Sequence, residues 1–191
     1  MTGKGKLTAD DGKYLLGVAR KTIQQALFDQ KEDKQTEEVL NPVFTEPRGT
    51  FATLTINGNL RGCIGHIIPQ ESLIEGIKIN AINASFRDPR FAPLTREEWE
   101  NVKIEISILT YPKPLSYSDA DGLLEKLRPG TDGVIIKKGI CEATFLPQVW
   151  EQLPEKEHFL THLCLKAGLK SDEWRKGDLE VSTYQVQAFE E

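Results

Sequence analysis

The clearest structural signal in the chain is the stretch Phe51-Ala52-Thr53-Leu54-Thr55-Ile56-Asn57-Gly58-Asn59-Leu60-Arg61-Gly62-Cys63-Ile64. Residues 51–56 are rich in β-branched and apolar side chains, and the pair Asn57-Gly58 favours a type I′ turn. A two-residue turn makes Ile56 face Asn59 and fixes the register of the two strands. The pattern therefore predicts an antiparallel hairpin with these facing pairs: Leu54 with Arg61, Thr53 with Gly62, and Ala52 with Cys63.

Helical and extended patterns alternate irregularly outward from this hairpin. Apolar residues at helical spacing predict helices over about 10–30 and 70–85, and residues 102–108 alternate apolar and polar side chains like a half-buried strand. In the second half, a further hairpin turns at Lys138-Gly139, and a helix is expected over about 154–167. Antiparallel hairpins mixed with helices, without a βαβ rhythm, predict an α+β protein with a mixed or antiparallel sheet and flanking helices.

Length and composition describe one ordinary globular domain. The chain has 191 residues, of which 39% are hydrophobic and 28% charged, so it is long enough for a sizeable core. We expect a single domain over 1–191, with residues 1–7 as a loose polar tail. The apolar runs are too short to cross a bilayer, so we expect no membrane partner.

The net charge and the cysteine content argue against a general nucleic-acid-binding protein and against a disulfide-bonded secreted protein. The net charge is −5, from 24 basic and 29 acidic residues, so a broad nucleic-acid surface is not expected. The cysteines, Cys63, Cys141 and Cys164, are odd in number and widely spaced, which is unsuited to a disulfide framework and fits a reducing compartment. We therefore predict a cytoplasmic protein.

The second strand of the first hairpin carries the best candidate for chemistry. Strand alternation places Arg61 and Cys63 on one face, and a guanidinium two residues from a thiol favours the reactive thiolate. Gly62 and Gly65 leave the main chain open to close approach by a ligand, so their amides could hold an oxyanion. The alternative is that Cys63 is a small buried hydrophobic residue and that the glycines form a bulge.

The histidines offer weaker candidates. His66 lies three residues past Cys63, so it is a substrate-binding or basic group only if the strand bends; otherwise it is a solvated or hydrogen-bonded side chain on the opposite face. His158 and His162 have a spacing that can hold a metal on a helix, but the apolar residues between them indicate packing. We predict no metal and no cofactor.

A second unusual segment is Phe86-Arg87-Asp88-Pro89-Arg90-Phe91. Its two arginines could clamp a phosphate or carboxylate, because a guanidinium binds both in a bidentate manner. Alternatively, Asp88 ties its neighbouring arginines into a rigid corner. We predict that Arg87, Asp88 and Arg90 lie near Cys63 in space and help to bind an anionic substrate.

The stretch Leu60 to Gly65 resembles the signature of the AMMECR domain family. The segment Phe86 to Phe91 also fits, and further matches extend the resemblance over most of the chain: Leu146 to Val149, Phe159-Leu160, Lys166 to Leu169, and Trp174. The resemblance implies an α+β fold of two subdomains, a larger and a smaller lobe, with the signature near a cleft between them. It implies no established reaction. Because bacterial and archaeal members are often encoded beside a Memo-like protein and a radical-SAM protein, it also implies these as partners.

Two hypotheses about function follow. In the first, the protein is an enzyme or an enzyme partner in a modification pathway, with Cys63 as a thiolate supported by Arg61 in an anion-binding cleft. In the second, the same cleft belongs to a non-catalytic module that binds a protein or a nucleic-acid end, and Cys63 simply packs. A thiol that labels faster than Cys141 and Cys164 would favour the first.

Overall fold

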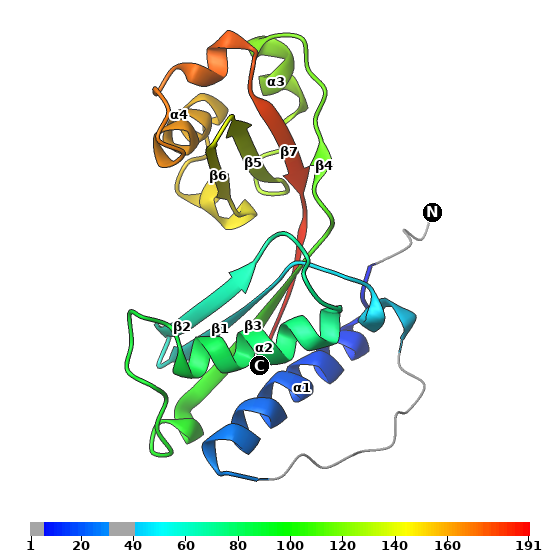
Figure 1. Ribbon diagram of the computed structural model, residues 1–191, viewed down its shortest axis with the longest axis vertical. Helices are drawn as coiled ribbons and strands as arrows, with labels where there is room; N and C mark the ends of the chain where they lie inside the picture. The colour runs from blue at the N-terminus through cyan, green and yellow to red at the C-terminus, as the bar shows by residue number, and fades with distance from the viewer. Residues whose placement is uncertain (1–5, 31–40) are drawn as a thin grey trace. The chain divides into compact units, whose positions relative to one another are not determined.

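The computed structural model of the protein describes residues 6–30 and 41–191 (Figure 1). These residues form two compact units. Unit 1 contains the described residues up to Leu109 together with Gln187–Glu191, and unit 2 spans Thr110–Val186. Each unit has its own antiparallel sheet and its own hydrophobic core, so the predicted α+β class is confirmed.

Unit 1 is a layer of helices on a four-stranded sheet with the strand order β2-β1-β3-β8. Its elements are α1 (Ala9–Leu27), η1 (Pro42–Thr45), β1 (Thr50–Ile56), β2 (Asn59–His66), α2 (Leu73–Phe86), η2 (Trp99–Asn101), β3 (Val102–Leu109) and β8 (Val186–Glu190). Helices α1 and α2 lie side by side and cover one face of the sheet (Figure 1). None of the helices in residues 6–30 and 41–191 is both long and apolar enough to cross a membrane.

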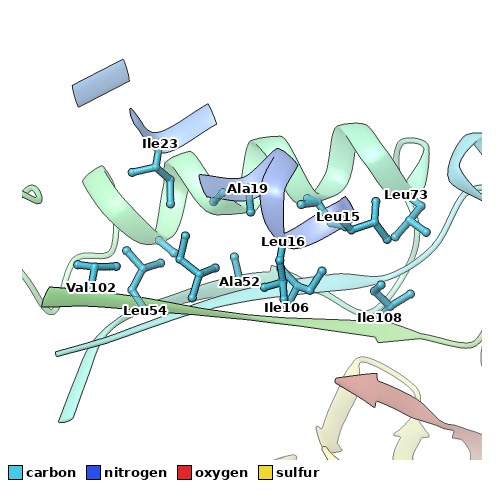
Figure 2. Close-up of a cluster of buried hydrophobic side chains, with 14 of the residues drawn as sticks. Leu15, Leu16, Ala19, Ile23, Ala52, Leu54, Leu73, Val102, Ile106 and Ile108 are labelled. Atoms are coloured by element: carbon cyan, nitrogen blue, oxygen red, sulfur yellow. The ribbon is translucent and has the colours of Figure 1, made fainter. Parts of the chain in front are cut away.

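Strand alternation divides the sheet of unit 1 into an inner and an outer face. Ala52 and Leu54 of β1 and Ile106 of β3 point to the inner face and pack against Leu15 and Ala19 of α1 (Figure 2). The residues between them on the same strands point to the outer face, away from the helices. The predicted alternation of residues 102–108 is thus confirmed, and the outer face carries its polar members.

The beginning of α1 corrects one expectation. The side chains of Thr8 and Asp11 form a capping box, so the helix begins at Ala9. Leu7 is buried, and its backbone exchanges two hydrogen bonds with the side-chain amide of Gln187. The predicted loose tail over 1–7 is therefore wrong at Leu7, while its residues 1–5 lie outside the described residues.

Unit 2 has a second four-stranded sheet, in the order β4-β7-β5-β6. Its elements are β4 (Lys113–Pro114), α3 (Ala120–Lys126), β5 (Gly133–Lys138), β6 (Cys141–Phe145), η3 (Pro147–Glu151), α4 (Lys156–Lys166), η4 (Glu173–Lys176) and β7 (Glu180–Tyr184). The predicted second hairpin is formed by β5 and β6, with Lys138 facing Cys141. The rings of Trp150 and Phe159 stack in the core with centroids 3.6 Å apart.

The first hairpin forms as predicted, but its register changes within it. Ile56 faces Asn59 and Thr55 faces Leu60, as a two-residue turn requires; beyond a bulge, Leu54 faces Gly62 instead of Arg61. The predicted pairs beyond the turn are therefore wrong by one residue. The physical reason is burial: Leu54 is fully buried on the inner face, so the regular register would have placed the Arg61 guanidinium in the apolar core.

Candidate functional site

The bulge determines where the residues of the signature point. Arg61 is the extra residue of β2, and the strand continues in regular register from Gly62. Gly62 then lies on the inner face beside α2, where a Cβ atom built on it would lie 2.1 Å from the Ala84 carbonyl oxygen. Cys63, facing Thr53, lies on the outer face.

The backbone of Cys63 is held by the turn that follows α2. The Cys63 N–H donates to Asp88 Oδ2 at 2.9 Å, and Arg90 Nη2 donates to the Cys63 carbonyl oxygen at 3.2 Å. Arg90 is itself bound to Asp88 through Nε and Nη2, at 3.0 and 2.7 Å. The prediction that this turn lies near the signature is confirmed. The alternative interpretation of the segment also holds in part, because Asp88 binds Arg90 and so forms a rigid corner.

Asp88 is the buried centre of this arrangement. Only 4% of the residue is exposed, and its pKa lies well below the ordinary range, chiefly because Arg90 donates to the carboxylate. Burial opposes this shift, while the Cys63 amide adds to it. Asp88 is therefore ionised at neutral pH and fixes both Arg90 and the edge of β2.

The sulfur of Cys63 has a hydroxyl beside it. Thr53 Oγ1 lies 3.4 Å from Cys63 Sγ and can donate to it. Arg90 lies within electrostatic reach of the thiol, since Cys63 is among the charges that raise the pKa of Arg90, after the larger effect of Asp88. Cys63 is half-buried, as is Cys141, whereas Cys164 is buried.

Arg61, the predicted support of the thiolate, binds another partner. Its guanidinium forms a bidentate ion pair with Glu98, at 2.7 and 2.9 Å, and also donates to the Ala92 carbonyl oxygen at 2.9 Å. Glu98 and Thr95 in turn form a capping box, in which each side chain accepts a hydrogen bond from the backbone N–H of the other residue. The structure thus assigns Arg61 to holding residues 92–98 against β2, and Arg90 is the cation near the sulfur.

The Arg61–Glu98 pair predicts a dependence of stability on pH. Arg61 lowers the pKa of Glu98 to about 2, so the stability from this pair is present above pH ~4.5 and is lost as the pH falls towards 2. We expect Glu98→Gln to lower the free energy of unfolding by about 1 kcal/mol at pH 7, since the pair is partly exposed. Urea unfolding should show this difference vanishing near pH 2; a difference that persists there would contradict the assignment.

The two glycines of the signature have different surroundings. Gly62 faces Leu54 within the ladder and is covered by Ala84, so the expected open amide does not occur there. A Cβ atom on Gly65 would lie 2.4 Å from the ring of Phe51. The polar backbone groups of Gly65 nevertheless point, like those of Cys63, towards the outer edge of the sheet.

His66 and Arg87 complete the predicted set. His66 faces the buried Thr50 on the inner face, opposite to Cys63, so a Cys63–His66 dyad is not formed. Its Nε2 lies 3.1 Å from Glu71 Oε1, although neither atom makes a well-directed hydrogen bond to any described residue. Arg87 is exposed and its Nη1 lies 3.3 Å from Asn83 Oδ1. The structure therefore brings Gly62, Asp88 and Arg90 to Cys63, and leaves His66 on the other face.

Sequence reasoning missed Thr53 and Glu98. Thr53 could not be found because the predicted register paired it with Gly62. The pattern Thr95-Arg96-Glu97-Glu98 is typical of a capping box, but no local signal links Glu98 to Arg61. Within residues 6–30 and 41–191, no group of three or more His, Cys, Asp and Glu side chains is arranged to hold a metal ion.

Comparison with known proteins shows the family. The AMMECR1 family matches residues 16–189. The protein Mbar_A1807 of Methanosarcina barkeri is 43% identical over 188 residues, which cover 97% of this chain and 92% of that protein. MJ0810 of Methanocaldococcus jannaschii is 39% identical over 97% of this chain and 92% of its own.

A solved structure has the same fold. The crystal structure of uncharacterized protein PH0010 from Pyrococcus horikoshii superposes with a TM-score of 0.82 at 34% identity, over 97% of this chain and 93% of that one. The sequence matches and this superposition span both units. The chain belongs to the AMMECR1 family.

Proposed function

We propose that the protein is an enzyme, or the partner of an enzyme, in a modification pathway, and that Cys63 is its nucleophile. The observation that carries this proposal is the clamp on Cys63. The buried Asp88 and its partner Arg90 bind both polar backbone atoms of this one residue, while its thiol stays half-buried on the outer face. Such a fixed backbone holds a reacting atom in place.

The chemistry proposed is thiolate attack on an electrophilic substrate. The thiolate electron pair forms a bond to the electrophilic atom, and the leaving group departs with its own electron pair. The hydroxyl of Thr53 and the charge of Arg90 support the thiolate, and the backbone of Gly65 at the sheet edge is the amide available to an oxyanion. Arg90 and the exposed Arg87 are proposed to bind an anionic group of the substrate.

The setting of this reaction belongs to the same proposal. A reducing cytoplasm would keep Cys63 as a free thiol, and three unpaired cysteines suit it. Memo-like and radical-SAM proteins are proposed as partners on the basis of the family resemblance.

A non-catalytic binding module is the second candidate. The observation that favours it is the pairing of charges around Cys63: Arg61 is bound to Glu98 and Arg90 to Asp88. Such ion pairs also build a rigid recognition surface, with the ring of Phe91 near both guanidiniums. In that case the thiol has no special reactivity.

Thiol labelling separates the two candidates. We expect the neutral reagent N-ethylmaleimide to modify Cys63 at least about threefold faster than Cys141, which is also half-buried, because Thr53 Oγ1 can donate to the Cys63 sulfur and Arg90 is bound to the backbone of the same residue. Burial raises the pKa of Cys164, so that thiol should react most slowly. Peptide mapping by mass spectrometry over time gives the three rates.

A change of Cys63 to serine provides the control. Cys63→Ser should leave the circular dichroism spectrum and the unfolding transition unchanged, because the side chain is only half-buried. Equal labelling rates at Cys63 and Cys141 would favour the binding module over the enzyme.

A further inference from the structure

Glu105 is a half-buried carboxylate on the outer face of unit 1. It lies on β3 directly opposite Thr53 of β1. Ser107 Oγ donates to Glu105 Oε1 at 3.3 Å. Among the described side chains, no Lys, Arg or His nitrogen lies within 4 Å of its carboxylate.

The other described acids of unit 1 that are buried or half-buried each have a basic side chain or several hydrogen-bond donors beside them. Glu71, Asp88 and Glu98 each lie beside a basic side chain. Asp11 uses its oxygens in the capping box of α1 and on Asn41. Glu105 differs from these, because a carboxylate that loses water without gaining a cation or several amide donors is unfavourable. A ligand that supplies a cation would remove this cost.

The register of the sheet places Glu105 in one row with the candidate nucleophile. Cys63 faces Thr53 across β2 and β1, and Thr53 faces Glu105 across β1 and β3. Directly facing side chains share a face, and neighbouring strands are about 4.8 Å apart, so Cys63 and Glu105 are separated by about 10 Å. Arg90 lies at the other end of this row, on the carbonyl oxygen of Cys63. The order along the row is therefore a cation, a thiol, a hydroxyl and a carboxylate.

We propose that this row binds a dipolar substrate whose cationic group, an ammonium or a guanidinium, pairs with Glu105 while its electrophilic atom lies at Cys63. This inference rests on the function proposed above and names the class of substrate. The anionic group of the same molecule would lie towards Arg90. A length of about 10 Å between the cationic group and the electrophilic atom matches the separation of Glu105 and Cys63.

A series of charged thiol reagents tests the pairing on the full chain. The trimethylammonioethyl, sulfonatoethyl and methyl methanethiosulfonates are cationic, anionic and neutral, and each forms a disulfide with the thiolate while methanesulfinate leaves. The measured quantity is the ratio of cationic to anionic rates at Cys63, with Cys141 of unit 2 as the internal reference. We expect Glu105→Gln to lower this ratio at Cys63 by about fivefold at low ionic strength, and not at Cys141.

The controls separate this inference from the function on which it rests. Glu75→Gln removes an equal charge on α2, at the other face of the sheet, and should leave the ratio at Cys63 unchanged. With Glu105→Gln, the neutral reagent should react at an unchanged rate, because it carries no charge that could pair with Glu105. If Cys63 outpaces Cys141 with the neutral reagent but Glu105→Gln leaves the ratio unchanged, the dipolar substrate is excluded while the nucleophile stands. If Cys63 is no faster than Cys141 with the neutral reagent, both proposals fall.

Discussion

Replacing Asp88 with alanine is expected to lower the free energy of unfolding by about 3 kcal/mol and to remove any excess reactivity of Cys63. The buried carboxylate accepts four hydrogen bonds, from the amides of Cys63 and Arg90 and from Nε and Nη2 of the Arg90 guanidinium. Alanine would leave the Cys63 amide without a partner at the edge of β2 and the Arg90 cation without its counter-charge. Urea unfolding and the maleimide labelling rates measure the two effects.

Unit 2 supplies a matched control for this substitution. Asp132 is also buried, and its carboxylate binds the amide and guanidinium of Arg128 much as Asp88 binds those of Arg90. Unlike Asp88, the Asp132 carboxylate accepts no hydrogen bond from a cysteine among the described residues. Asp132→Ala should destabilise the protein by a similar amount and leave the Cys63 rate unchanged. Loss of Cys63 reactivity in both variants would show that general destabilisation, not the clamp, controls the thiol.

The Asp88 effect should also depend on pH. Its pKa in the folded protein lies below the ordinary value near 4, so its contribution is fully present above that value and declines as the pH falls below it. The difference in stability between the wild type and Asp88→Ala should therefore be constant from pH 6 to 8 and shrink in acid. A difference that grows in acid would contradict the ionised carboxylate.

Replacing Gly62 with alanine is expected to be at least as damaging. The new Cβ atom would lie 2.1 Å from the Ala84 carbonyl oxygen, and both contacting groups are backbone, of β2 and of α2. Neither backbone group can relieve the clash by a side-chain rotation, so the strand and the helix must separate and the packing between them is lost. We expect a loss of about 3 kcal/mol or more, or a failure to fold, as measured by urea unfolding and far-ultraviolet circular dichroism.

Gly17 is the matched control for Gly62. It lies within α1, and a Cβ atom built on it meets no atom within 4 Å. Gly17→Ala should therefore stabilise the protein by up to about 1 kcal/mol, because alanine is the better helix former. If Gly62→Ala unfolds at the same urea concentration as the wild type, the close approach of β2 and α2 is not maintained in solution.

Local patterns in the sequence were sufficient for the elements and for the fold class. The Asn57-Gly58 turn, the alternation of residues 102–108 and the helical stripes depend on residues that are neighbours in the chain, and each corresponds to an observed element. The same alternation correctly placed His66 on the face opposite to Cys63. Helix limits were less accurate: α1 ends at Leu27, and α2 begins at Leu73, whose backbone N–H donates to the carbonyl oxygen of the distant Glu46.

The partners of the site residues were decided by the tertiary structure. Regular pairing from the turn would have turned Arg61 to the inner face, and the bulge occurs because that face is filled by Leu54 and α2. The bulge moves Gly62 inward and leaves Arg61 to pair with Glu98, 37 residues further along the chain. The clamp of Asp88 on Cys63 and the row from Cys63 to Glu105 likewise join residues 25 or more positions apart.

The sequence by itself determined which residues form strands and helices, since those preferences are local. Only the folded structure decided which charged side chains pair, because a guanidinium cannot be buried in the apolar core. Only the folded structure likewise showed where two backbones approach so closely that glycine is required.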